Sequence, residues 1–152
     1  MEWLNEEKLD EVRDMLKHQK LEKFLKLCGN TYPDLVKVFL TNMWFDDDVM
    51  YSKFKGVDMA INDEVWLAVA SLRNAGIAVG RGNTTDLEDF NKVQFFKTCV
   101  RNPNTTMKGY HVGGLSLTSR IIAFIVIWLL TPRHFNHVVL TEEDLILMYC
   151  LM

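Results

Sequence analysis

The chain has few of the residues that bridge or restrain a backbone, since its 152 residues include three cysteines and three prolines. Cys28, Cys99 and Cys150 are odd in number and widely spaced, and each has apolar neighbours, so we interpret them as reduced core thiols rather than a disulfide framework. The amino terminus is acidic and lacks the basic start and apolar stretch of a signal peptide. We therefore expect an intracellular protein of the cytoplasm or nucleus that is not secreted.

Long apolar runs and a surplus of positive charge are also absent. The most apolar stretch, residues 121–130, is about half as long as the roughly 20 residues that a bilayer-spanning helix needs. We expect this stretch to be a helix buried on nearly all sides, and we expect no membrane partner. Lys and Arg number 17 against 20 Asp and Glu, whereas a domain that binds nucleic acid electrostatically usually has a basic surplus.

The sequence lacks the motifs of common catalytic sites, including C-x-x-C, H-E-x-x-H and G-x-S-x-G. The aspartates at 46–48 are consecutive, whereas a two-metal site needs carboxylates that converge from separate elements. The glycine-rich stretch 76–82 lacks the Lys-Ser/Thr pair of a phosphate-binding loop. No further ligand is paired with His134 and His137, so we interpret them as surface histidines. We expect no catalytic residue, metal ion, cofactor or small-molecule ligand.

Apolar residues recur at helical spacing along most of the chain, and capping residues set the expected helix ends. Asn62 or Asp63 can begin a helix that Gly76 stops, while Thr85 with Glu88 and Thr141 with Asp144 form capping-box patterns. The first region ends at Gly29 and is either one helix or two that meet near His18. The expected helices span residues 2–27, 33–44, 62–75, 85–100, 118–130 and 141–152.

One segment has the pattern of strands. Residues 49–61 hold β-branched and aromatic side chains on both sides of Lys55-Gly56, which predicts a small hairpin. Apolar residues make up 49% of the chain and charged residues 24%, as in an ordinary globular domain. The sequence therefore predicts a mainly α fold: a single compact helical domain over residues 1–152, with about six helices and a small β-hairpin.

The largest apolar side chains on the expected helices are the candidate core. We expect the domain to pack around the helix at 121–130, with these residues in its core: Trp66, Phe90, Phe96, Phe124 and Trp128. Residues 101–118 hold three glycines, one proline and several Asn and Thr residues, and we expect them to form a long surface loop.

Three segments resemble, in order and spacing, a family known as the plant transposon protein domain. They are TYPDLVKVFLTNM at 31–43, YSKFKGVDMAIN at 51–62, and LSLTSRIIAFIVIWLLTPRHFNHVVLTEEDLILMYCLM at 115–152. The resemblance implies a protein derived from a plant transposable element, and it carries over no site residue. The family pattern continues past the point where this chain stops inside an apolar helical run, so we expect the natural protein to extend beyond Met152.

The expected function is a non-catalytic protein-interaction or assembly module of a plant transposable-element-derived protein, with a protein partner or self-association through an apolar surface. The alternative is a nucleic-acid-binding module that uses the loop at 101–120, where aromatic rings can stack on bases beside basic side chains. Its candidate contact residues are Arg101, Lys108, Tyr110, His111, Arg120 and Arg133. An enzyme ranks third.

Overall fold

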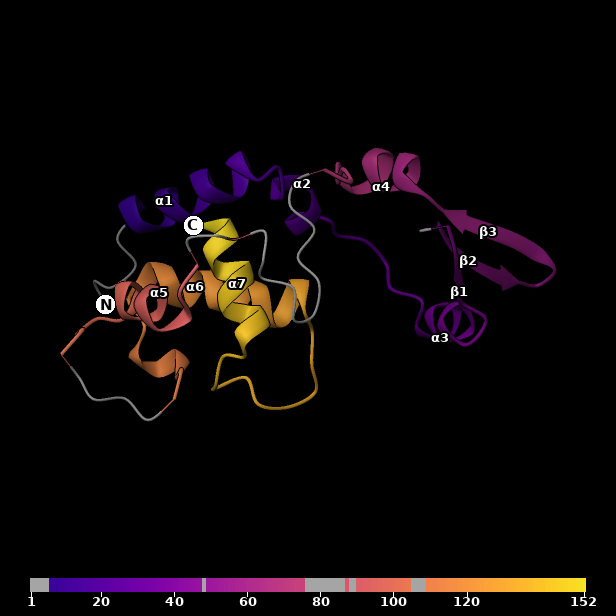
Figure 1. Cartoon of the computed structure of the whole chain (residues 1–152). Coiled ribbons are helices and arrows are strands. Elements are labelled where there is room, and N and C mark those ends of the chain that lie inside the picture. Colours follow the sequence, from indigo (N-terminus) through magenta and orange to yellow (C-terminus); the bar gives the residue numbers. More distant parts are fainter. Residues whose placement is uncertain (1–5, 48, 76–86, 88–89, 105–108) are drawn as a thin grey trace. The chain divides into compact units, whose positions relative to one another are not determined.

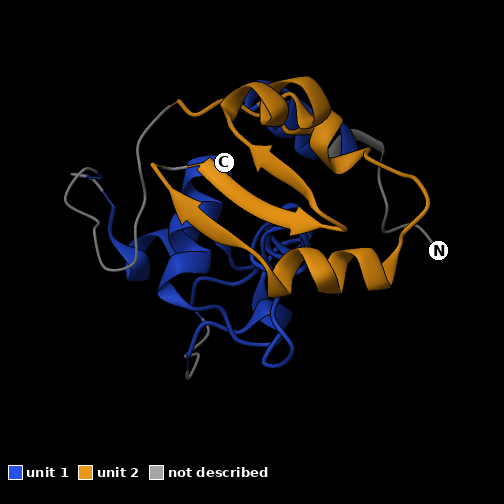
Figure 2. Cartoon of the chain, turned by 90° about the vertical axis from the view of Figure 1, so that its right-hand side faces the viewer, with its two compact units in different colours: residues 1–19, 77–152 blue, residues 20–76 orange. Residues whose placement is uncertain are grey.

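The computed structural model describes residues 6–47, 49–75, 87, 90–104 and 109–152, and these form two compact units. Unit 1 comprises Met1–Gln19 and Ile77–Met152, and unit 2 comprises Lys20–Gly76 (Figure 2). The fold is mainly helical, as expected, with a small antiparallel sheet. No helix in the described part is long and apolar enough to cross a membrane.

The regular secondary structure in the described part of unit 1 is helical, apart from two isolated backbone bridges. The α6 helix contacts both α1 and α7, and α5 contacts α7 (Figure 1). Thr118 of α6 donates to Glu11 of α1 at 2.9 Å, and Gln19, which directly follows α1, donates to the Cys150 carbonyl of α7 at 2.7 Å. The elements are α1 (Glu6–His18), α5 (Lys92–Cys99), η1 (Val112–Gly114), α6 (Leu117–Ile125), η2 (Val126–Leu130) and α7 (Glu142–Leu151).

The α6 helix continues as η2, a turn of π-helix that ends in a hydrogen bond from the Thr131 N–H to the Val126 carbonyl. Residues on one side of α6 and η2 are fully buried: Ile122, Ala123, Val126 and Ile127. The expectation that this helix is buried on nearly all sides was wrong. Phe124, Trp128 and Leu129 lie on the other side and are exposed, because the neighbouring helices cover only one stripe.

The core differs from the set expected from sequence. Phe96 is buried and Phe90 is half-buried, but Trp66, Phe124 and Trp128 are exposed. Helical periodicity identified apolar stripes without showing which neighbour would cover each one. The buried residues of α7 include Leu145, Ile146, Met148 and Leu151.

Two helix starts can be compared with their capping signals. The box at Thr141 and Asp144 is confirmed, since each side chain accepts the other residue's backbone N–H, at 3.2 and 2.8 Å. Thr85 and Glu88 lie outside the described residues. The described helix in that region begins later, at Lys92, because the Asn91 side chain accepts the N–H groups of the next turn.

The described end of the expected surface loop at 101–118 lies in the core instead. Val100 bridges to Leu115 and His111 bridges to Val139, and the Ser116 N–H donates to the Cys99 carbonyl at 2.8 Å. These backbone bonds carry Val112 and Leu115 into the interior, where both are buried. Burial of the apolar side chains of Val112 and Leu115 holds this part of the segment against the core.

Unit 2 contains a three-stranded antiparallel sheet in the order β1-β2-β3. The expected hairpin is confirmed as β2 and β3, and both Lys55 and Gly56 have positive φ, at 47° and 82°, as a tight hairpin turn requires. Contacts join α3 to β2 and α4 to β3. The elements are α2 (Glu22–Leu25), α3 (Pro33–Thr41), β1 (Trp44–Asp46), β2 (Val49–Phe54), β3 (Val57–Ile61) and α4 (Asp63–Ala70).

The sequence did not predict β1, because its residues were assigned to a helix end and a polar break. The Asn42 side chain donates to the Lys53 carbonyl at 3.0 Å, and the Trp44 ring stacks on Tyr51 with centroids 5.5 Å apart. These contacts with β2 end α3 early and extend the hairpin to three strands. Lys20, at φ 59°, separates α1 from α2, so the first region is two helices.

The α4 helix begins at its expected cap, Asn62, whose side chain accepts the Val65 N–H at 3.0 Å. It ends at Ala70 rather than Ala75, because Ser71 adopts a left-handed conformation. The Ser71 N–H then donates to the Leu67 carbonyl and the Leu72 N–H donates to the Trp66 carbonyl. The glycine expected to stop it, Gly76, lies outside the described residues.

Candidate interaction surface

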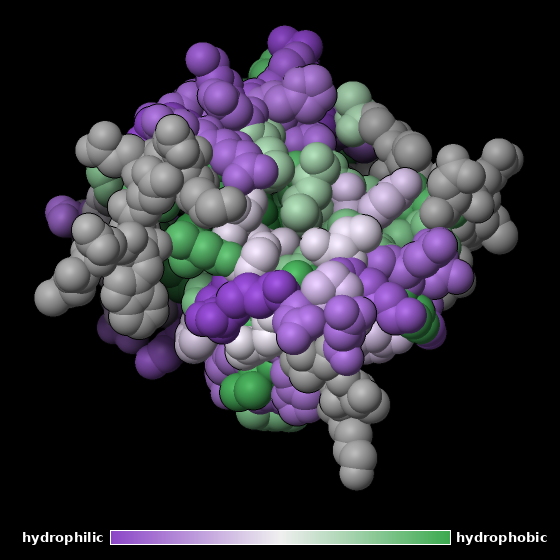
Figure 3. All heavy atoms as spheres, turned by 90° about the vertical axis from the view of Figure 1, so that its left-hand side faces the viewer, coloured by the Kyte–Doolittle hydropathy of each residue, from purple (hydrophilic) through white to green (hydrophobic). Residues whose placement is uncertain are grey.

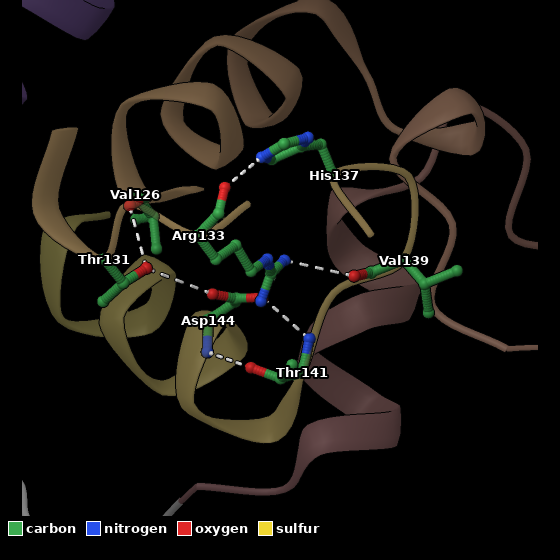
Figure 4. A network of polar contacts seen from close by, with 7 residues as sticks. All are labelled: Val126, Thr131, Arg133, His137, Val139, Thr141 and Asp144. Atoms are coloured by element: carbon green, nitrogen blue, oxygen red, sulfur yellow. Dashed lines mark hydrogen bonds and ion pairs between the residues drawn. The ribbon is translucent and has the colours of Figure 1, made fainter. Parts of the chain in front are cut away.

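A buried ion pair fixes the segment between η2 and α7. The Arg133 guanidinium lies 2.8 Å from Asp144 Oδ2, which also accepts the Thr141 N–H at 2.8 Å (Figure 4). Arg133 further donates to the Val139 carbonyl at 3.2 Å. One guanidinium therefore holds both ends of the turn that follows Pro132.

The turn packs against η2 through an aromatic contact. His137 Nε2 lies 2.6 Å from the Arg133 carbonyl, which can only accept, so this nitrogen carries the hydrogen (Figure 4). The imidazole stacks on the Trp128 indole, with centroids 4.0 Å apart and planes 16° from parallel. His137 therefore holds the turn against Trp128 of η2. His134, in the same turn, is exposed.

Exposed apolar side chains lie on α6, on η2 and in the turn that the stack of His137 on Trp128 holds against η2. We call this surface the Trp128 face and define it by Phe124, Trp128, Leu129, Phe135 and Val138. Trp128 is 54% exposed and Phe135 is 80% exposed. Contiguous exposed apolar residues on a soluble protein commonly mark an interaction site.

A separate cavity of about 360 Å³ opens beside α5. The ring of Phe96, which is buried, meets the Tyr110 ring edge-on, with centroids 5.0 Å apart. Figure 3 looks onto the side of unit 1 where α5 lies in Figure 1, and hydrophobic atoms show in the middle of that face among hydrophilic ones. The described lining residues are Val93, Phe96, Lys97, Val100, Pro103, Gly109 and Tyr110.

The arginines proposed as nucleic-acid contacts make hydrogen bonds and an ion pair within unit 1. Arg101 and Arg120 both donate to the Gly113 carbonyl, at 3.0 and 2.7 Å, and Arg133 is paired with Asp144. Of the three, only Arg133 is paired with a carboxylate, while Arg101 and Arg120 keep their charge and are oriented by hydrogen bonds to carbonyls of the same unit. Lys108 lies outside the described residues.

The aromatic candidates are likewise engaged in packing. Tyr110 is half-buried against Phe96, and its carbonyl accepts the Leu140 N–H at 2.8 Å. His111 is half-buried in the bridge to Val139. Both rings are therefore only partly accessible for the predicted stacking on a base.

Little in the described residues points to chemistry. No group of three or more His, Cys, Asp or Glu side chains among them could hold a metal ion. Burial raises the pKa of the Cys99 and Cys150 thiols, which disfavours the reactive thiolate. Cys28 is exposed, so the expectation that all three cysteines are core thiols was wrong for this residue. The aspartates at 46 and 47 end β1 and begin its turn.

Comparisons of the chain with protein-family models, with curated proteins and with solved structures found no match. The geometry of the two units is therefore the basis for a functional assignment. Sequence reasoning identified the apolar carboxy-terminal third but missed the Trp128 face, because it placed Trp128 and Phe124 inside. No sequence signal identified the cavity, because it depends on the contact of Phe96 with Tyr110 across a loop, which helical periodicity does not show.

Proposed function

We propose that this protein is a non-catalytic assembly module that associates with a second copy of itself, or with a protein partner, through the Trp128 face. The exposure of Trp128 and its neighbours carries the proposal. Aromatic residues held rigidly at a surface are the usual energetic centres of protein interfaces. The stack on His137 fixes the indole in place, so little side-chain entropy would be lost on association.

The wider class of the protein is also part of the proposal. The segments at 31–43, 51–62 and 115–152 support a protein derived from a plant transposable element, through their resemblance to the plant transposon protein domain. An interaction or assembly role suits a module in which no catalytic arrangement was found among the described residues.

The test is the mass of the purified chain by size-exclusion chromatography with light scattering, at low and high salt and over a range of concentrations. We expect an oligomer that salt does not dissociate, because burial of apolar surface drives it. Trp128→Ser and Phe135→Ser should each weaken association by about thirtyfold or more, as expected for a hot-spot loss of about 2 kcal/mol.

Trp66→Ser is the matched control, because Trp66 is an exposed tryptophan of unit 2. It should leave the mass unchanged. A wild-type chain that stays monomeric at all concentrations would contradict self-association and leave a different protein as the partner of this face. A Trp66→Ser variant that dissociates while Trp128→Ser does not would contradict association through the Trp128 face. A shift only with oligonucleotides and only at low salt would favour the nucleic-acid alternative instead.

A further inference from the structure

The cavity beside α5 has the size and lining of a small-ligand site. Its volume of about 360 Å³ falls at the lower end of the range for ligand pockets, about 300 to 1,000 Å³. Most of its described lining is apolar, with Phe96 buried and Val100 half-buried. A site of this size and lining suits one aromatic ring or branched apolar group.

Among the described lining residues, one side chain is charged at neutral pH, and it is a lysine. Lys97 lines the cavity, its side chain is exposed, and it has no ion-pair partner among the described residues. The other basic residues nearby are engaged: Lys92 pairs with Glu142 at 2.9 Å, and Arg101 donates to the carbonyls of Gly113 and Leu115. No described lining residue is acidic. The lining therefore favours an anion over a cation.

The end of α5 weakens this preference only slightly. A helix carboxy terminus has a partial negative charge, which disfavours a bound anion. The last carbonyl of α5, that of Cys99, already accepts the Ser116 N–H at 2.8 Å. Lys97 lies in the last turn and opposes the same partial charge.

From this geometry we propose that the α5 cavity binds a ligand made of one aromatic or branched apolar group and a carboxylate, with the apolar group against Phe96 and Tyr110 and the carboxylate at Lys97. The sequence predicted no such ligand. The site is separate from the Trp128 face, so it adds to the proposed function and does not depend on it.

The experiment is a titration of the full chain followed by amide chemical shifts in NMR spectra. Phenylacetate should shift the amides of Lys97, Gly109 and Tyr110 in a saturable way. Phenethylammonium, which has the same ring and the opposite charge, should bind more weakly, and acetate should cause no saturable shift. Saturable binding of phenethylammonium as tight as that of phenylacetate would overturn the proposed role of Lys97.

Two variants separate the apolar and charged contributions. Val93→Trp should abolish phenylacetate binding. Val93 lines the cavity and is 50% exposed, so a tryptophan at this position can fill the cavity without disturbing the core. Lys97→Gln should weaken phenylacetate about fivefold, since an exposed charge contributes up to about that factor. Lys37→Gln, an exposed lysine of unit 2, is the control and should change nothing.

Binding that persists unchanged in Val93→Trp would show that the cavity is not the site. Binding that is unchanged in Lys97→Gln would remove the carboxylate from the proposal. A tripeptide that ends in phenylalanine, compared with its carboxy-terminal amide, identifies the source. Tight binding of the free-acid peptide alone would indicate a chain terminus, and failure of both peptides with retained phenylacetate binding would indicate a small acid.

Discussion

Substitution of Asp144 tests how unit 1 holds its carboxy-terminal helix. The Asp144 side chain is 2% exposed, and its Oδ2 atom receives both the Arg133 guanidinium and the Thr141 N–H at 2.8 Å. Thr131 lies 3.5 Å from the other carboxylate oxygen. One carboxylate therefore caps α7 and neutralises a guanidinium from the preceding turn.

Two replacements separate the charge from the hydrogen bonds. Asp144→Asn can keep an acceptor oxygen at the Oδ2 position, removes the charge, and places an amide NH2 at the Oδ1 position, 3.5 Å from the Thr131 hydroxyl. Because the Arg133 side chain is 23% exposed and remains partly hydrated, we expect a loss of about 1–2 kcal/mol in unfolding free energy. Asp144→Ala also leaves the Thr141 N–H without its cap and the Arg133 guanidinium without any acceptor at position 144, so its cost should be about 3–5 kcal/mol.

Hydrogen exchange at the slow amides of α6 and α7 is the suitable assay, since the chain has two units and exchange measures the stability of unit 1 by itself. Asp144→Ala should speed exchange by about a hundredfold or more. Glu143→Gln, an exposed neighbour in the same turn, is the control and should cost about 0.5 kcal/mol or less. Equal losses for the Asn and Ala variants would refute the separation of charge from hydrogen bonding.

Two further predictions concern the hairpin and the cysteines. Gly56→Ala should destabilise the β2-β3 hairpin by about 1–2 kcal/mol, because Gly56 has φ 82° and alanine is strained at that angle. Faster amide exchange in β2 would show the loss, and unchanged exchange would contradict the turn geometry. At mildly alkaline pH iodoacetamide should alkylate the exposed Cys28 first, then Cys150 and last Cys99. Burial raises the pKa of the Cys150 and Cys99 thiols above the ordinary 9.0, which disfavours their reactive thiolate forms. Mass spectrometry gives the order of alkylation, and early modification of Cys99 would contradict its burial.

The local elements that the sequence determined are those whose signals lie within a few residues. Thr141 with Asp144, Asn62, and Lys55-Gly56 occupy the positions predicted for caps and a turn, because each satisfies backbone groups or dihedral preferences of its own neighbours. Capping and turn chemistry act over a single turn of chain, so no tertiary information is needed to place them.

Tertiary structure alone decided which apolar side chains are buried. The stripe from Phe124 to Trp128 and the stripe from Ile122 to Val126 have the same helical spacing, yet only the second packs against α1 and α7. Backbone pairing likewise decided two other positions: Leu115 is buried where it pairs with Val100, and Trp44 is a strand residue because it pairs with Tyr51. Which side chains are exposed at the Trp128 face and at the α5 cavity was likewise decided by packing, because burial is a property of neighbours that local sequence does not specify.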